Sequence, residues 1–399
     1  MTGALEGIRV LDLSRVLAGP WSTQVLGDLG ADVIKVEQPG AGDDTRAWGP
    51  PFLPGSQDSA YFSCANRNKR SIAIDIASAE GQTLIRRLAA QSDVVVENFR
   101  VGGLAKYGLD YDDLRAVKPD LVWCSVTGFG QTGPEKDRGG YDFLIQGMSG
   151  LMSVTGDADG PPTKVGIPIS DLTTGLYAAI SILAALRHRD RTGEGQRIDL
   201  ALLDAQLALM SNQAANWLNG GPEPRRLGNQ HPNIVPYQVF ACADGDILIA
   251  TANDRQYAKL CRVLGREELA GDPRYATMDG RSANRDTLLA EIGSVIERWE
   301  SGPLVGALND AGVPSGRINT VPEILADPQV AAREQVRSIQ RSDGTDVRFV
   351  GFPAKLSGSP AQYRTAPPRA GEDGDAILAD LLTLDAAEIA RLRAAGTIG

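Results

Sequence analysis

The sequence has few of the residues that build metal clusters, disulfide frameworks and histidine-dependent active sites. Its 399 residues include only 4 cysteines and 2 histidines. The cysteines form no C-x-x-C pair, which argues against a zinc knot or a disulfide framework. Because His188 and His231 lie far apart, no H-E-x-x-H metal site can exist, and a Ser-His-Asp triad would have to use one of these two.

Positive charge and long hydrophobic runs are also scarce. The formal net charge is −10, whereas nucleic-acid-binding proteins normally carry a basic surface. The longest apolar stretch, Leu176 to Leu186, is far shorter than the ~20 residues that cross a bilayer. The N-terminus lacks the basic and apolar regions of a signal peptide. We therefore expect a cytoplasmic protein that binds neither nucleic acid nor membrane.

The composition that remains is that of a globular chain, with 42% hydrophobic and 23% charged residues. Up to about residue 215, short β-branched runs alternate with helical segments. This alternation predicts βαβ units, and thus a Rossmann-like α/β domain with a parallel sheet. The expected strands cover residues 8–13, 32–37, 71–76, 93–97 and 121–126, and the expected helices between them cover residues 22–29 and 79–91.

The pattern changes after a stretch rich in glycine, proline and charge at residues 220–226. The turn Ala243-Asp244-Gly245 lies between two strand-like runs and predicts a hairpin. Helical stretches follow to about residue 333, then two short strands and two last helices. We predict a large α/β domain over residues 1–215, a small α+β domain over residues 216–330, and a segment over residues 331–399 that returns to the large domain.

One glycine motif imitates a dinucleotide-binding fingerprint. Gly128 to Gly133 matches G-x-G-x-x-G and follows a predicted strand. That fingerprint also requires a helix that begins within the motif. Here Pro134 and a polar run follow, so no helix can start in register. The motif therefore indicates a glycine loop rather than an NAD site.

A single carboxylate, Asp171, stands between an extended segment and a long apolar helix. The local pattern is typical of a helix N-cap. At such a position, backbone amides and the helix dipole hold a carboxylate in its anionic form. A carboxylate can also act as a covalent nucleophile. On local pattern alone, both interpretations stay open.

Other segments follow one another in a recognisable order along the chain. They are residues 7–20 (GIRVLDLSRVLAGP), 29–37 (LGADVIKVE), 42–46 (GDDTR), 68–71 (NKRS), 93–99 (DVVVENF), 139–142 (GGYD), 159–162 (DGPP), 253–257 (NDRQY), 272–275 (DPRY) and 312–316 (GVPSG). With these segments and the stretch around Asp171, the chain resembles the class III (formyl-CoA/carnitine-type) CoA-transferase family over almost its whole length.

The resemblance implies transfer of coenzyme A from an acyl-CoA to a free carboxylic acid, without a metal. Asp171 takes the place of the family's nucleophile, which passes through an aspartyl mixed anhydride and an aspartyl-CoA thioester. Residues 228–237 are similar to members that use dicarboxylates, which suggests succinyl-CoA and a C4–C6 diacid. Arg15, Arg46 and Arg226 are candidates to bind the far carboxylate of that acid. The resemblance also implies an interlocked homodimer.

The family's CoA contacts map onto a defined set of positions. Gln38 stands where some members carry a basic residue, which puts one contact in doubt. Leu17 replaces a glutamine of the oxalate-using branch, which argues against oxalate as acceptor. Lys69, Arg70 and Lys136 are further cations expected beside strand ends, where CoA phosphates would bind. The implied CoA-binding residues are Leu17, Ala18, Gln38, Ile74, Asn98, Phe99, Arg100, Lys106, Arg138 and Tyr141.

Two features are expected to close the site. The loop Gly228-Asn229-Gln230 resembles the family's glycine-bearing loop over the active site, although an ordinary turn fits the same residues. Trp48 is expected to wall the acyl pocket, unless it lies in a surface loop.

Two other functions stay open. An α-methylacyl-CoA racemase would need a histidine at the position of Tyr141, and a phenol with an ordinary pKa near 10 exchanges protons poorly at neutral pH. A catalytically inactive acyl-CoA binder is the other alternative.

Overall fold

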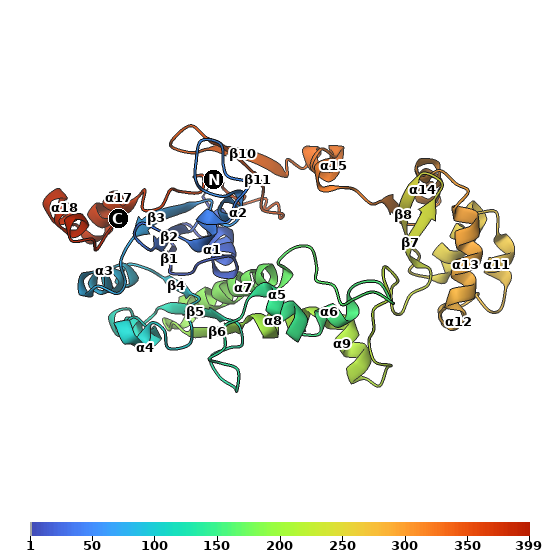
Figure 1. Cartoon of the computed structure of the whole chain (residues 1–399), viewed down its shortest axis with the longest axis horizontal. Coiled ribbons are helices and arrows are strands. Elements are labelled where there is room, and N and C mark those ends of the chain that lie inside the picture. The colour runs from blue at the N-terminus through green and yellow to red at the C-terminus, as the bar shows by residue number, and fades with distance from the viewer. Residues whose placement is uncertain (1) are drawn as a thin grey trace. The chain divides into compact units, whose positions relative to one another are not determined.

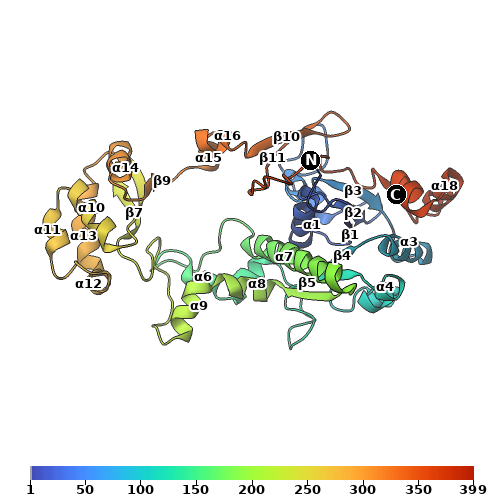
Figure 2. The ribbon, with the colours of Figure 1, turned by 180° about the vertical axis from the view of Figure 1, so that it is seen from behind.

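The computed structural model describes residues 2–399, and the contacts within the chain divide it into two compact units. The larger unit combines residues up to Leu151 with Val165–Gly220 and Gln329–Gly399. The smaller unit contains Met152–Lys164 and Gly221–Pro328. Figure 1 colours these segments by residue number, and Figure 2 shows the same ribbon from behind.

The larger unit is built on a six-stranded parallel sheet with the order β3-β2-β1-β4-β5-β6 (Figure 1). The predicted α/β fold with a parallel sheet is confirmed, and β2 begins and ends at the predicted residues. The edge strand β6 was not predicted, because its alternating polar and apolar residues lack the apolar run of the central strands. The strands are β1 (Arg9–Asp12), β2 (Asp32–Glu37), β3 (Lys69–Ala73), β4 (Val94–Glu97), β5 (Val122–Thr127) and β6 (Arg197–Ala201).

Helices cover both faces of this sheet, and each face has its own apolar core. One core is formed with α1 (Ala18–Asp28), α5 (Asp142–Met148), α7 (Ile169–Thr192) and α8 (Leu202–Leu209). The other is formed with α3 (Ala79–Ala90), α4 (Tyr111–Val117), α17 (Gly374–Leu382) and α18 (Ala386–Ala394). Shorter elements are η1 (Asp44–Ala47), α2 (Ala60–Ser63), η2 (Ala105–Tyr107), α6 (Leu151–Val154), α9 (Ser211–Leu218) and the hairpin β10 (Val336–Gln340) with β11 (Asp346–Val350).

The helix α7 is longer than the apolar run in the sequence suggests. Its 24 residues are long and apolar enough, by length and composition, to cross a membrane. In this structure α7 packs against α1 and β5, and half of its most apolar stretch is buried. Its apolar residues therefore supply much of one core of the sheet.

The C-terminal part of the chain completes the larger unit. Ile398 forms a bridge with Ile74, directly after β3, and Gly399 N donates a hydrogen bond to Ala73 O. Further back, the backbone N–H of Asn68 donates to Thr365 O. Residues from both ends of the sequence thus form one core.

The smaller unit has its own antiparallel sheet and its own core. The hairpin predicted around Ala243-Asp244-Gly245 is present. Its strands are β7 (Tyr237–Cys242), β8 (Gly245–Ala250) and β9 (Ser315–Arg317). Its helices are α10 (Asp254–Val263), α11 (Glu267–Gly271), α12 (Met278–Ala283), α13 (Arg285–Ile296), α14 (Ser301–Asp310) and α15 (Val321–Leu325), and α16 (Pro328–Ala332) leads back to the larger unit.

Candidate active site

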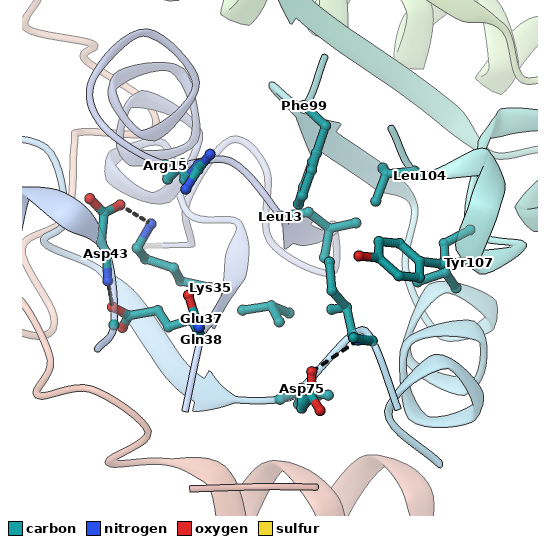
Figure 3. Close-up of a pocket in the computed structure, with 16 residues that line it drawn as sticks. Leu13, Arg15, Lys35, Glu37, Gln38, Asp43, Asp75, Phe99, Leu104 and Tyr107 are labelled. Carbon is teal, nitrogen blue, oxygen red and sulfur yellow. Dashed lines mark hydrogen bonds and ion pairs between the residues drawn. The ribbon is translucent and has the colours of Figure 1, made fainter. Parts of the chain in front are cut away.

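Two adjoining pockets lie at the carboxyl ends of the parallel strands, where open α/β sheets bind their ligands. The first, which we call the Asp171 pocket, has a volume of about 230 Å³. The second, the Gln38 pocket, has a volume of about 270 Å³, and Ile74 is among the residues that line it. Figure 3 shows Gln38 and Tyr107 in the wall of this pocket. Arg15 and Phe99 line both pockets, so the two lie side by side, and we refer to them together as the groove.

Asp171 lies in the first turn of α7, which begins at Ile169 and has Pro168 at its N-cap position. The prediction of an N-cap role for Asp171 is therefore wrong. The carboxylate that caps this helix is Asp142, at the start of α5. Its Oδ1 accepts hydrogen bonds from the backbone N–H groups of Ser170 at 2.8 Å and Asp171 at 3.3 Å.

Asp142 reaches the helix because two backbone segments cross without side chains between them. A Cβ atom on Gly128 would lie 2.6 Å from the Cα atom of Gly140. Glycine at both positions lets the chain before Tyr141 pass directly over the end of β5. As expected, no helix starts in the glycine motif, and its first residue serves this close packing.

The electrostatics around Asp171 differ from the expectation of a permanently anionic carboxylate. Burial of the carboxyl group, together with the nearby negative charge of Asp142, raises its pKa to about 7. The amides of the helix terminus cannot offset this effect, since they donate to Asp142 instead. Near neutral pH the group is therefore divided between its acid and its carboxylate, a balance typical of reactive carboxyl groups.

One tyrosine lies close enough to this carboxylate for its pKa to respond to the charge of Asp171. Burial raises the pKa of Tyr61 to about 12, and the charges of Cys64, Asp171 and Asp142 contribute to the shift. The ring of Tyr61 packs 5.3 Å from the ring of Trp48. Sequence analysis did not identify Tyr61, because it lies in the four-residue helix α2, which no strong pattern marks.

Most of the predicted CoA-binding residues line one of the two pockets. Asn98 has a further role, since both ends of its side-chain amide bind the backbone of Arg15, at 3.0 and 2.7 Å. Lys106 lines neither pocket, but its Nζ lies 4.6 Å from the ring centre of Tyr107, which does. The Asp171 pocket is lined by Leu17, Ala18, Asn98, Phe99, Arg100, Arg138 and Tyr141, and also by Lys136. The Gln38 pocket is lined by Gln38, Ile74 and Phe99.

Two expected phosphate ligands are elsewhere. Lys69 is fully buried, and its ammonium group donates to Asp12, Asn66 and Pro20 O. Arg70 pairs with Asp32, the first residue of β2, at the opposite end of the strands. Neither cation can meet a ligand in the groove, so these two predictions are wrong.

The three arginines expected to bind the far carboxylate of a diacid lie in different places, and only one of them lines the groove. Arg46 is buried and bound to Glu37 and Asp58, which leaves it unable to reach a substrate. Arg226 belongs to the smaller unit, where it donates to Asp157 O. The loop Gly228-Asn229-Gln230 belongs to that unit as well. Arg15 lines the groove, 3.2 Å from Asp44 at its rim.

The like charges of Asp142 and Asp171 predict a shifted pH profile in one variant. For the CoA transfer that the family resemblance implies, kcat/KM of the wild type should rise with pH through about 7, as Asp171 loses its proton. Asp142→Asn retains an oxygen for the Ser170 N–H but removes the repelling charge. We expect its kcat/KM to rise about one pH unit lower.

The matched control is Asp137→Asn, which neutralises another carboxylate of the same pocket. It should leave the midpoint in place. Burial also raises the pKa of Glu97 to about 7, but Glu97 is the same in all three proteins and cannot cause a difference between them. An unchanged midpoint in Asp142→Asn would contradict the assignment.

Comparison with known proteins identifies relatives that match almost the whole chain. The family model of CoA-transferase family III matches residues 5–374. The chain is 49% identical to succinate–glutarate CoA-transferase of Agrobacterium fabrum (strain C58) over 96% of both chains. It is 41% identical to human succinyl-CoA:glutarate CoA-transferase, over 99% of this chain and 90% of that one. The crystal structure of a CAIB/BAIF family protein from Brucella suis superposes with a TM-score of 0.84 and 48% identity, covering 96% of this chain and all of that one.

Proposed function

Because the chain belongs to CoA-transferase family III, we propose that it transfers coenzyme A from succinyl-CoA to a C4–C6 dicarboxylate, with Asp171 as the nucleophile. The observation that carries this proposal is the position of Asp171. Its carboxyl group stands in a pocket at the carboxyl ends of the strands, with a pKa of about 7. A carboxylate so placed is available for attack on a thioester near neutral pH.

The reaction proceeds through four exchanges at Asp171. The carboxylate attacks the thioester carbonyl of succinyl-CoA, which forms a mixed anhydride and releases the CoA thiolate. The thiolate attacks the aspartyl carbonyl, which forms an aspartyl-CoA thioester and releases succinate. The acceptor carboxylate then attacks this thioester, which forms a second anhydride and releases the CoA thiolate again. The thiolate finally attacks the acceptor's acyl carbon, which yields the new acyl-CoA and restores Asp171.

The groove supplies cations for a polyanionic substrate although the chain as a whole is acidic. Arg15, Arg100, Lys136 and Arg138 all line the Asp171 pocket. In our proposal the nucleotide part of CoA occupies the Gln38 pocket and the thioester lies near Asp171. Charged groups that converge on one groove raise the local concentration of an oppositely charged ligand.

The proposed acceptor follows from the relatives, whose names specify succinate, succinyl-CoA and glutarate. A diacid requires a cation for the carboxylate that does not react. Of the three arginines considered for this role, Arg15 is the one that lines the pocket of Asp171. We assign the far carboxylate to Arg15.

Racemisation is not favoured by the site. It would require a second proton-transfer group opposite Asp171. Among the described residues that line the Asp171 pocket there is no histidine, and Tyr141 occupies the position that such a histidine would take. A phenol is a weak base at neutral pH.

We also propose a homodimer. Three neighbouring helices of the larger unit expose large apolar side chains, including Phe143, Ile180 and Leu207. Exposed apolar surface of this kind is typical of subunit interfaces. Sedimentation equilibrium should give twice the 42.3 kDa of one chain, and a monomer at micromolar concentration would contradict the proposal.

Mass spectrometry of the intact protein tests the function directly. The protein is mixed with succinyl-CoA, acetyl-CoA or oxalyl-CoA in separate samples, with or without glutarate. Borohydride is then added to trap the adduct, and peptide mapping locates the modified residue. We expect succinyl-CoA alone to modify Asp171, and glutarate to remove the modification with formation of glutaryl-CoA. Modification of another residue would overturn the role of Asp171. Exchange of an α-proton in deuterated water without any adduct would indicate racemisation.

A further inference from the structure

The loop between β1 and α1, residues Ser14 to Leu17, holds an unusual backbone conformation. Val16 has a φ of +71°. This left-handed region is rarely adopted by residues other than glycine, and least of all by β-branched ones. The loop also forms part of the groove, since Arg15 lines both pockets and Leu17 lines the Asp171 pocket. Strain of this kind persists only where surrounding contacts impose it.

Asp43 makes one of the contacts that impose this conformation, next to the two hydrogen bonds by which Asn98 holds the backbone of Arg15. The backbone N–H of Val16 lies 3.3 Å from each of the two carboxylate oxygens of Asp43. The ammonium group of Lys35 donates to Asp43 Oδ2 at 2.8 Å (Figure 3). It also donates to Ser14 O at 2.9 Å. The buried ion pair of Lys35 and Asp43 therefore holds the loop at two backbone groups, the carbonyl of Ser14 and the N–H of Val16.

Asp43 is itself rigidly held. Its Oδ1 accepts hydrogen bonds from the backbone N–H and the hydroxyl of Thr45, at 3.0 and 2.7 Å. Its own N–H donates to Glu37 Oε2 at 2.8 Å. Burial disfavours the charge, but Lys35 lowers the pKa of Asp43 to about 2. The carboxylate thus stays ionised and fixed in place.

We propose that Asp43 is a positioning residue for acyl-CoA binding, because it holds Val16 in its left-handed conformation and so fixes Arg15 and Leu17 along the groove. Asp43 also lines the Gln38 pocket, so recovery of binding by Val16→Gly is the result that separates a positioning role from direct contact with the ligand. A loop that is already ordered loses less conformational freedom when the ligand binds, and affinity rises accordingly. The inference rests on the proposed function, since the ligand is an acyl-CoA.

A purely structural role would give a different result, and the chain offers a matched control. Asp28 is also a fully buried carboxylate that pairs with one cation, Arg67. It lines neither pocket. Asp28→Asn and Asp43→Asn should therefore both lower thermal stability, while only Asp43→Asn should weaken ligand binding.

Isothermal titration with free CoA, which needs no transfer, measures the effect. We expect the Kd of Asp43→Asn to rise roughly tenfold or more, and that of Asp28→Asn to stay within about twofold. Adding Val16→Gly to Asp43→Asn should recover much of the loss, because glycine adopts this φ without strain. Asp43→Glu serves if Asp43→Asn does not fold, since it keeps the charge beside Lys35 but displaces the carboxylate from Val16, and it too should weaken binding.

Several outcomes would overturn the inference. They are an unchanged Kd in Asp43→Asn or Asp43→Glu, an equal loss in Asp28→Asn, and no recovery with Val16→Gly. A wild-type protein that binds CoA but transfers none would instead refute the proposed function and leave this inference standing. A wild-type protein that does not bind CoA would refute both.

Discussion

Replacing Asp171 with asparagine is expected to reduce kcat for CoA transfer at least about a thousandfold. The amide has almost the same shape but cannot attack a thioester to form an anhydride. Free CoA should bind the variant with nearly wild-type affinity, since the cations of the groove are unchanged. Steady-state assays with succinyl-CoA and glutarate measure the first effect, and calorimetric titration with CoA measures the second.

The choice of asparagine excludes two other causes of lost activity, namely loss of the hydrogen bond to Asp142 and loss of the folded structure. Asp171 makes its backbone contact with Asp142 through its N–H, and asparagine retains that contact. A loss of activity with an intact thermal unfolding midpoint therefore reports on the carboxylate alone. Residual turnover above a few per cent of the wild type would refute the covalent mechanism, whatever the cause of the remaining activity.

Replacing Arg46 with methionine is expected to lower the free energy of unfolding by about 3–5 kcal/mol. The guanidinium group is almost inaccessible and donates to both oxygens of Glu37, each at 2.7 Å, and to Asp58 at 2.8 Å. It also lies 3.7 Å from the ring centre of Phe62. Methionine fills much of the space but takes the ion-pair partner away from the buried Glu37, which keeps only uncharged donors such as the Asp43 N–H and the Ser71 hydroxyl. This uncompensated charge accounts for the cost.

Urea unfolding measures the effect, and Arg369→Met provides the comparison. Arg369 also forms an ion pair, with Asp343, but its side chain is 54% exposed. Water screens such a pair, so its loss should lower the free energy of unfolding far less than the loss of Arg46. Equal destabilisation in the two variants would show that the buried ion pairs of Arg46 stabilise the larger unit no more than an exposed pair does.

The sequence was sufficient to predict the elements of the sheet that depend on local pattern. The strand over Asp32–Glu37 was predicted at its exact ends because an apolar run is enclosed between turn residues. The role proposed for Asp171 came from family resemblance, since its local pattern suggested a helix cap. The cap is Asp142, which depends on a crossing of backbone segments at Gly128 and Gly140 that no local pattern records.

The errors among the cations have a similar cause. Lys69 and Arg70 are neighbours in a strand, so their side chains point to opposite faces of the sheet. Whether either cation meets a ligand then depends on partners from other strands, namely Asp12 and Asp32. The sequence shows that a lysine or arginine is present, but it does not show which group the cation binds in the folded protein.

The order of the chain has a consequence for synthesis on the ribosome. The smaller unit is almost contiguous, so most of its core can form as soon as Pro328 has emerged. The larger unit must wait much longer. Arg46 donates to Pro368 O, Arg364 binds the carbonyl groups of Gly27, Gly30 and Ala31, and Gly399 pairs with Ala73. The strands that carry the groove are thus translated before most of the smaller unit, but they gain their last contacts only from residues translated after it.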